Sequence, residues 1–152
     1  MHIDPDQPVA SLGDGLMIAS LPDEAIDALV ETAGMNAAFP LASVEVRHLG
    51  GKLGRHRRQN GALASLQAPY LMFAGSMIPT AELKAPTMAQ VAAVEDAVTP
   101  WAAQHTYLNF SETPRPRATL WTEHAFRRLR QIKASVDPGD MIRSNHPVPP
   151  AR

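Results

Sequence analysis

The hydrophobic residues of this chain follow a helical spacing in some stretches and a strand-like alternation in others. The first helical stretch begins near Pro22, which suits the first turn of a helix, and Ser20 is placed to cap it. Apolar residues then recur at intervals of three and four, and Gly34 is a natural stop. The pattern predicts a helix between residues 20 and 34.

Residues 41–49 instead alternate between two kinds of side chain, which is typical of a half-buried strand. One face of the predicted strand takes Val44, Val46 and His48. The opposite face takes Ser43, Glu45 and Arg47. Two glycines, at positions 50 and 51, follow and end the strand.

A shorter, mostly apolar run at residues 69–74 predicts a second and more buried strand, which Pro79 ends. The first 19 residues hold two prolines and two glycines, so they are predicted to form a loop with one short extended piece at residues 16–18. Two strands are few for a stable sheet. The small number of strands favours a chain that is part of a larger protein.

Two further amphipathic helices are predicted in the second half of the chain. The first spans residues 87–103, and Pro100 either kinks it or begins a separate last turn. Its apolar stripe consists of Met88, Val91, Val94, Val98 and Trp101. The second helix begins with Thr122 as its cap. Its predicted inner positions are Ala125, Leu129, Ile132 and Val136, and its outer positions are Arg127, Arg128, Arg130 and Lys133.

The segments around these helices follow neither spacing. Residues 106–110 are predicted to be extended, and Pro114 and Pro116 keep the next stretch irregular. Prolines recur after Asp137, so the tail is expected to lie against another surface rather than on its own chain. The order of elements predicts an α+β fold, with a small antiparallel sheet, amphipathic helices packed on one of its faces and an extended C-terminal tail.

Composition narrows the classes of function. The chain contains no cysteine, which excludes disulfides, thiolate metal sites, cysteine nucleophiles and a covalent flavin link through sulfur. No apolar run is as long as a membrane span, and the start at residues 1–6 is acidic rather than signal-like. We therefore expect a cytoplasmic protein with no membrane partner.

Basic residues cluster in the loop after the first predicted strand, at Lys52, Arg55, His56, Arg57 and Arg58. Such clusters can bind nucleic acid, but no aromatic residue interleaves this one and the net charge of the chain is −1. A solvated loop without a nucleic-acid partner is the better interpretation. The glycines at positions 50, 51 and 54 fit neither a dinucleotide-binding nor a Walker pattern, so they predict a turn rather than a phosphate loop.

The sequence lacks the residue patterns that a metal site or a serine-hydrolase site requires. The six histidines show no paired spacing of metal ligands and no EF-hand loop is present, so no metal site is predicted. Ser76 follows a glycine, but the second glycine of a nucleophile elbow is missing.

The last third of the chain carries the most specific combination of motifs. Tyr-Leu-Asn-Phe at residues 107–110 is followed by a basic helix that ends at Asp-Pro (137–138) and by a tail with Asn-His-Pro (145–147). In this order and spacing, the motifs resemble the C-terminal end of the berberine-bridge-enzyme-like family of FAD-linked oxidases. The strand at residues 44–48, which leads into two glycines, resembles a substrate-side strand of the same family.

The resemblance implies cofactor contacts in the Tyr-Leu-Asn-Phe motif. In the family this segment crosses over the flavin, and the asparagine of its Tyr-X-Asn-Tyr pattern contacts the cofactor, so Asn109 and Tyr107 are the implied FAD contacts. Several family members have a tyrosine at the fourth position that takes the proton of the substrate hydroxyl, whereas this chain has Phe110. Without the resemblance, an edge strand with a solvent-facing Asn109 is the ordinary interpretation.

Phe110 cannot accept a proton, so the resemblance implies another base or a different reaction. Some relatives use a glutamate of the sheet, which makes Glu45 the first substitute and His48 the second. Arg47 shares a strand face with Glu45 and is expected, with Phe110, to line the substrate side. The alternative is an exposed salt bridge between Glu45 and Arg47 on the outer face of the sheet.

The organisation that the resemblance implies is that of a partial enzyme. Residues 1–104 correspond to part of a substrate-binding α+β domain and residues 105–152 to the closing C-terminal segment, whereas the flavin-binding domain has no counterpart. The implied function is hydride transfer from a small-molecule substrate to FAD, for which another domain or subunit must supply the flavin site. The alternative is a non-enzymatic α+β module that binds a partner or forms a homodimer through its sheet edge.

Overall fold

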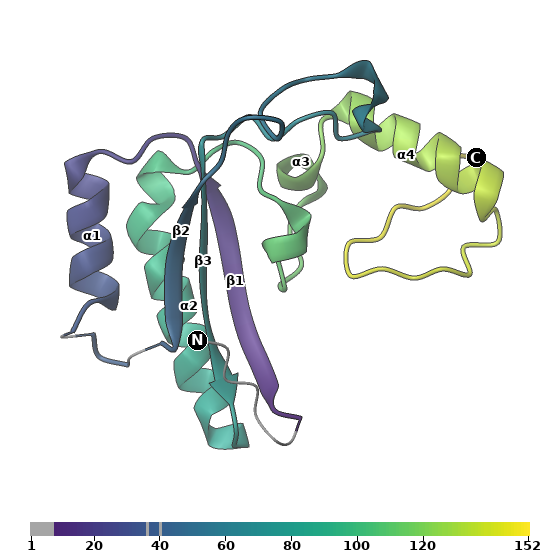
Figure 1. Ribbon diagram of the computed structural model, residues 1–152. Coiled ribbons are helices and arrows are strands. Elements are labelled where there is room, and N and C mark those ends of the chain that lie inside the picture. The colour runs from purple at the N-terminus through teal and green to yellow at the C-terminus, as the bar shows by residue number, and fades with distance from the viewer. Residues whose placement is uncertain (1–7, 36, 40) are drawn as a thin grey trace.

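The computed structural model describes residues 8–35, 37–39 and 41–152, and it contains a three-stranded sheet followed by a C-terminal helical part (Figure 1). The strands are β1 (Ala10–Ile18), β2 (Ser43–His48) and β3 (Tyr70–Ile78). The α-helices are α1 (Asp23–Ala33), α2 (Lys84–Val98), α3 (Arg117–Leu120) and α4 (Glu123–Val136). Short 3-10 turns span Arg58–Asn60, Ala81–Leu83, Thr99–Trp101 and Leu108–Phe110. The acidic start at residues 1–6 lies outside the described residues.

The sheet is antiparallel throughout, and β3 lies between β1 and β2. Phe73 of β3 lies opposite Gly15 on one side and opposite Glu45 on the other. The two predicted strands are confirmed, and so is the short extended piece at residues 16–18, which belongs to β1. The loop predicted at residues 10–15 is wrong, because β1 begins at Ala10. Gly13 and Gly15 indicated turns, but they lie inside β1, where the Phe73 ring and the Met72 carbonyl leave no room for a side chain.

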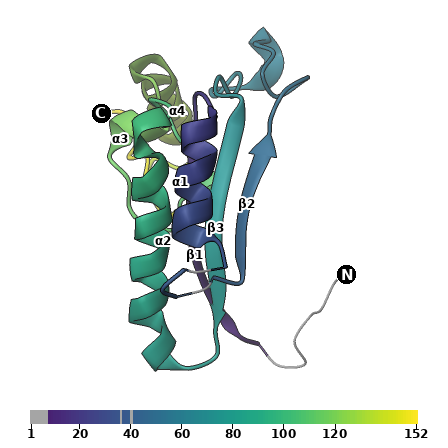
Figure 2. The ribbon, with the colours of Figure 1, turned by 90° about the vertical axis from the view of Figure 1, so that its left-hand side faces the viewer.

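Helices α1 and α2 lie on the same face of the sheet (Figure 2). The core between the sheet and α2 contains alternate strand residues and the inner stripe of the helix, namely Leu16, Ile18, Met72, Ala74, Val91, Val94 and Val98. Burial of this apolar surface is the main favourable contribution to folding. The predicted fold class is therefore confirmed as α+β, with a small antiparallel sheet and helices packed on one face.

The ends of these helices agree with the sequence pattern in part. Helix α2 ends at Val98, and a separate 3-10 turn containing Pro100 follows it, as one of the two predicted alternatives. Gly34 follows the last residue of α1, as predicted. The predicted cap at Ser20 is wrong, because α1 begins at Asp23 and Pro22 occupies its N-cap position.

The C-terminal part has its own apolar cluster, which α3, α4 and the tail share. Its buried residues are Leu120, Trp121, Ala125 and Phe126. Thr122 caps α4 as predicted, since its Oγ1 accepts a hydrogen bond from the Ala125 N–H at 3.2 Å. The predicted burial of Ile132 and Val136 is wrong, because the cluster covers only the first two turns of α4 and leaves these side chains 42% and 73% exposed.

Three predictions about the segments around α4 are also wrong. Residues 108–110 form a 3-10 turn instead of continuing an extended piece, and α3 begins directly after Pro116, where irregular chain was predicted. The tail folds back on its own chain, because the Ala151 N–H donates to the Arg130 carbonyl at 3.1 Å and the Arg130 guanidinium donates to the Pro150 carbonyl at 3.1 Å. None of the helices in the described part has both the length and the apolarity that a membrane crossing requires.

Candidate functional site

The face of the sheet opposite α1 and α2 carries the charged side chains of β2. This far face consists of the odd-numbered positions 13–17 of β1, 43–47 of β2 and 71–75 of β3. Arg47 Nη2 donates a hydrogen bond to Glu45 Oε1 at 2.6 Å, and the two side chains are 51% and 36% exposed. The exposed salt bridge between Glu45 and Arg47, which was the alternative prediction, is thus formed, and both side chains remain accessible to a ligand.

Phe110 lies at the centre of the far face and joins the predicted residues. The Arg47 guanidinium stands 4.9 Å from the centroid of its ring, close enough for a cation–π contact. The ring of Phe73 meets it edge-on at 5.5 Å between centroids, and the ring of Tyr107 stacks on it at 5.9 Å. The structure therefore brings Glu45, Arg47 and Tyr107 together around the rings of Phe73 and Phe110, which form an aromatic floor.

Glycines allow the aromatic floor to approach β1. A Cβ at Gly13 would lie 2.3 Å from the Phe73 ring, and a Cβ at Gly15 would lie 3.2 Å from the Phe110 carbonyl oxygen. The first distance is shorter than real Cβ contacts, and the second would require the Phe110 backbone to move by a few tenths of an ångström. The two glycines that indicated turns in the sequence thus create the space in which Phe73 and Phe110 meet.

The remaining predicted residues lie around this centre or away from it. Asn109 is exposed in the 3-10 turn at Leu108–Phe110, and its amide has no hydrogen-bond partner among the described residues. Tyr107 is half-buried against Met17 and Leu71. His48 lies on the opposite face from Glu45 and stacks on Tyr70 at 5.1 Å, so the structure does not bring the two proposed bases together.

A charged cluster fixes the segment that carries these aromatic residues. Arg115 Nη2 bonds to Asp14 Oδ1 of β1 at 2.9 Å and to Glu95 Oε1 of α2 at 2.5 Å. Asp14 also accepts hydrogen bonds from the N–H and hydroxyl of Thr113, and Glu112 accepts one from the Gly13 N–H at 3.0 Å. Burial raises the pKa of Glu95, and the contact with Arg115 opposes this rise.

Sequence reasoning missed both halves of this arrangement. Arg115 stands between two prolines, and its partners Asp14 and Glu95 are far from it in the sequence, so no local pattern indicates them. The apolar run at residues 69–74 predicts only that Phe73 belongs to a buried strand, although the alternation of β3 places it on the face opposite Met72. Its period-two position was the signal that could have found it.

No family model and no curated protein matches this sequence. Solved structures do match its fold over nearly its whole length. BBE-like 1 of Physcomitrella patens has a TM-score of 0.78 at 12% identity, covering 98% of this chain and 32% of that chain. A variant of berberine bridge enzyme has a TM-score of 0.74 at 14% identity, with coverages of 96% and 34%. CrmK, a flavoenzyme involved in shunt-product recycling in caerulomycin biosynthesis, has a TM-score of 0.73 at 15% identity, with coverages of 97% and 35%.

The chain has the fold of about a third of a berberine-bridge-enzyme-like protein. This structural match confirms the resemblance that the sequence motifs suggested. The berberine-bridge-enzyme-like fold includes both the sheet and the C-terminal helical part, because almost all of the chain is covered. At 12–15% identity the likeness is one of fold, and the chain spans about a third of the length of these structures.

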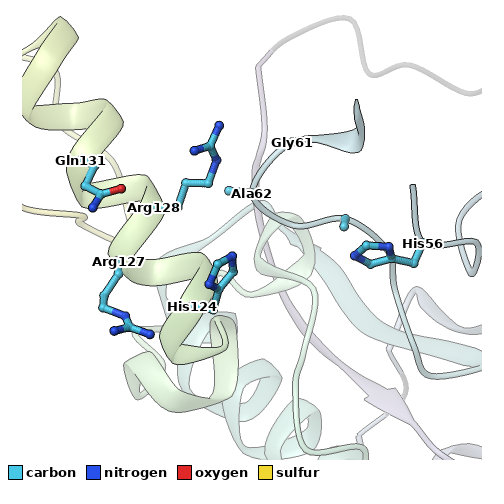
Figure 3. A pocket seen from close by; sticks show the side chains of 8 residues that line it. His56, Gly61, Ala62, His124, Arg127, Arg128 and Gln131 are labelled. Atoms are coloured by element: carbon cyan, nitrogen blue, oxygen red, sulfur yellow. The ribbon is translucent and has the colours of Figure 1, made fainter. Parts of the chain in front are cut away.

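A cleft of about 610 Å³ lies away from the far face, between α4 and the loop before β3 (Figure 3). Polar and basic side chains line it: His56, His124, Arg127, Arg128 and Gln131. His124 and Arg128 project from α4 toward the loop, whereas Arg127 turns away (Figure 3). Neither arginine forms an ion pair with a described carboxylate, so the cleft can accept an anionic group.

Proposed function

We propose that this chain is the substrate-side part of an FAD-dependent oxidoreductase, and that it forms an active site only with a flavin-binding domain from another segment or subunit. The observation that carries the proposal is the far face, where the Glu45–Arg47 pair stands beside an aromatic floor. This face belongs to a sheet whose fold is that of berberine-bridge-enzyme-like structures.

The groups on the far face suit a flavin ring better than the phosphates of the cofactor. Phe73 and Phe110 provide an apolar aromatic surface, and the exposed amide of Asn109 can both donate and accept hydrogen bonds. Gly51, with a φ of 58°, lies in a turn where an added Cβ would meet no atom within 4 Å, rather than at the start of a helix, where a phosphate would be bound. We infer that this chain contacts the ring and that the other domain holds the nucleotide.

In the proposed oxidation of an alcohol-like substrate, Glu45 and Arg47 of the far face have separate roles. When bound, FAD accepts the hydride that leaves the substrate carbon. Glu45 takes the proton that leaves the substrate oxygen, because it is an accessible carboxylate whose ion-pair partner Arg47 lies over the Phe110 ring. Arg47 orients this carboxylate through their hydrogen bond and covers one side of the Phe110 ring.

Exposed apolar side chains support the part of the proposal that concerns a further domain. Val136, Met141 and Ile142 are 73%, 83% and 74% exposed around the end of α4. Neighbouring large apolar groups at such exposure are costly in water unless another surface covers them. Contact with the flavin-binding domain would bury them.

Titration of the purified chain with riboflavin, FMN and FAD tests the proposal. We expect weak, saturable changes in flavin absorbance and fluorescence that are similar for all three ligands, because only the ring is contacted. Asn109→Ala should weaken this binding about fivefold, corresponding to the loss of about one hydrogen bond. Asn145→Ala, which removes an exposed amide from the tail, is the matched control. A chain that perturbs none of the three flavins would contradict the proposal.

A second candidate function is a non-enzymatic module that associates through its sheet edge. The observation in its favour is the outer edge of β2, which has no backbone partner among the described residues. This candidate predicts association of the chain without any effect on flavin spectra.

A further inference from the structure

One edge of the sheet, β1, is covered by other segments of the chain, whereas the other edge, β2, is uncovered in the described part. The segment after α2 covers β1, where the Ala103 N–H donates to the Met17 carbonyl at 2.8 Å and the Gly13 N–H donates to Glu112 at 3.0 Å. The outer edge of β2 has no hydrogen-bond partner in the described part of the chain. Figure 2 shows β2 as the outermost strand, with α1 and α2 over one face of the sheet. An uncovered edge is a template for a further strand.

The backbone groups that this edge offers can be identified. The Leu49 N–H donates to the Pro69 carbonyl at 2.6 Å, which continues the pairing of β2 with β3. Hydrogen bonding alternates along an antiparallel strand, so the odd-numbered residues of β2 bond to β3. The N–H and C=O groups of Val44, Val46 and His48 therefore point outward, toward any added strand.

Charge then selects how a second copy would fit this edge. Two antiparallel copies related by a two-fold axis place one residue opposite itself. An axis at Glu45 sets two carboxylates opposite each other, and an axis at Arg47 sets two guanidinium groups opposite each other. An axis at Val46 places each Glu45 opposite the Arg47 of the other copy, and it also joins the outward backbone groups of Val46. Opposite charges directly across a sheet stabilise pairing, whereas like charges oppose it.

We propose that two copies of this chain associate through β2 in the register centred on Val46. Each three-stranded sheet thereby becomes half of a six-stranded one, which is a more usual size. Opposite residues in an antiparallel pair share a face, so the two far faces become continuous and the helices of both copies lie together on the other face. The partner copy adds its own Glu45 and Arg47 next to the candidate site. This inference does not rest on flavin binding.

Sedimentation equilibrium of charge variants tests the register. Glu45→Arg and Arg47→Glu each place like charges across the axis, so each should raise the dimer dissociation constant at least about tenfold. The double variant Glu45→Arg/Arg47→Glu restores opposite charges and should return the constant to within about threefold of the original. A monomeric original chain at high concentration, or a double variant no better than the single ones, would overturn the proposal.

A single thiol tests the position of the axis directly. The chain contains no cysteine, so Val46→Cys introduces one thiol per copy, opposite its own equivalent. Opposite hydrogen-bonded residues lie about 5.5 Å apart between Cα atoms, within the range that a disulfide spans. Oxidation should link Val46→Cys into covalent dimers at least about tenfold faster than Thr99→Cys, an exposed control at the far end of α2. Equal rates would show that random collisions, not strand pairing, form the link.

Discussion

At the scale of single residues, the far face depends on Gly15, which has no side chain. A Cβ at Gly15 would lie 2.4 Å from the Met72 carbonyl oxygen and 3.2 Å from that of Phe110. We expect Gly15→Ala to lower the free energy of unfolding by about 2 kcal/mol, because the backbone must move to relieve the overlap. Urea denaturation of Gly50→Ala is the control, since no atom lies within 4 Å of the new Cβ there, and its effect should stay below about 0.5 kcal/mol.

Asp137 provides a pH-dependent test at the same scale. The Lys133 ammonium group and the N–H groups of Ile142 and Met141 lower the pKa of Asp137 from 3.8 to about 2. A lowered folded-state pKa means that this contribution to stability is complete above pH 4 and is lost as pH falls toward 2. Asp137→Asn should therefore be less stable than the original chain at pH 7, and the difference should shrink between pH 4 and pH 2. Thermal unfolding across this range measures it, and a difference independent of pH would contradict the assignment.

The site residues whose positions the sequence predicts correctly are those that a short-range pattern places. Strand alternation alone places Glu45 and Arg47 on one face, and the structure pairs them there. The ring contacts of Phe110 with Phe73 join residues far apart in the chain. Their meeting depends on the fold of the whole sheet, which no local spacing determines.

At the scale of elements, α4 depends on its first turn. The Thr122 hydroxyl satisfies the Ala125 N–H, one of the backbone donors that a helix leaves unpaired at its start. Thr122→Ala should lower the free energy of unfolding by about 1 kcal/mol, whereas Thr122→Ser retains the acceptor and should cost less than half of that. Urea denaturation of both variants separates the lost cap from the lost methyl group, and equal losses would contradict the capping role.

The elements that the sequence predicted well have strong periodicity. Helix α2 and strand β2 each show a continuous pattern, and both are present. The sequence predicts only residues 16–18 of strand β1, because the glycines at 13 and 15 serve packing against β3 rather than turns. The apolar positions of α4 at Ile132 and Val136 fit the helical pattern but remain exposed, since periodicity identifies an apolar face and not the surface that covers it.

At the scale of the whole molecule, the segment at residues 105–116 links the sheet to the C-terminal helical part. Arg115 ties this segment to β1 through Asp14 and to α2 through Glu95. The apolar cluster around Trp121 lies beyond it and shares no residue with the core beneath the sheet. Tyr107 and Phe110 pack on a third apolar cluster, formed by Met17, Ala68 and Leu71. The position of the aromatic floor over the far face therefore depends on this cluster together with the ion pairs of Arg115.

Removal of Arg115 should loosen this segment without unfolding α4. Arg115→Met leaves the carboxylate of Asp14, which is only 4% exposed, without its counter-charge, and we expect a loss of about 3 kcal/mol in the free energy of unfolding. Asp14→Asn/Arg115→Met removes that buried charge and should recover part of the loss. Hydrogen exchange should accelerate at residues 106–113 of Arg115→Met, while the amides of α4 stay protected by their own cluster.

The pH dependence of Arg115→Met distinguishes lost charge pairing from lost packing. Burial already raises the pKa of Glu95 above 4.5, and removal of Arg115 takes away the group that opposes this rise. An acid with a raised folded-state pKa destabilises the fold as pH rises from its unfolded value through its folded one. The deficit of Arg115→Met should therefore be largest near pH 7 and should shrink as pH falls toward 4.5. A deficit that stays constant over this range would mean that the Arg115 side chain acts through its contacts alone.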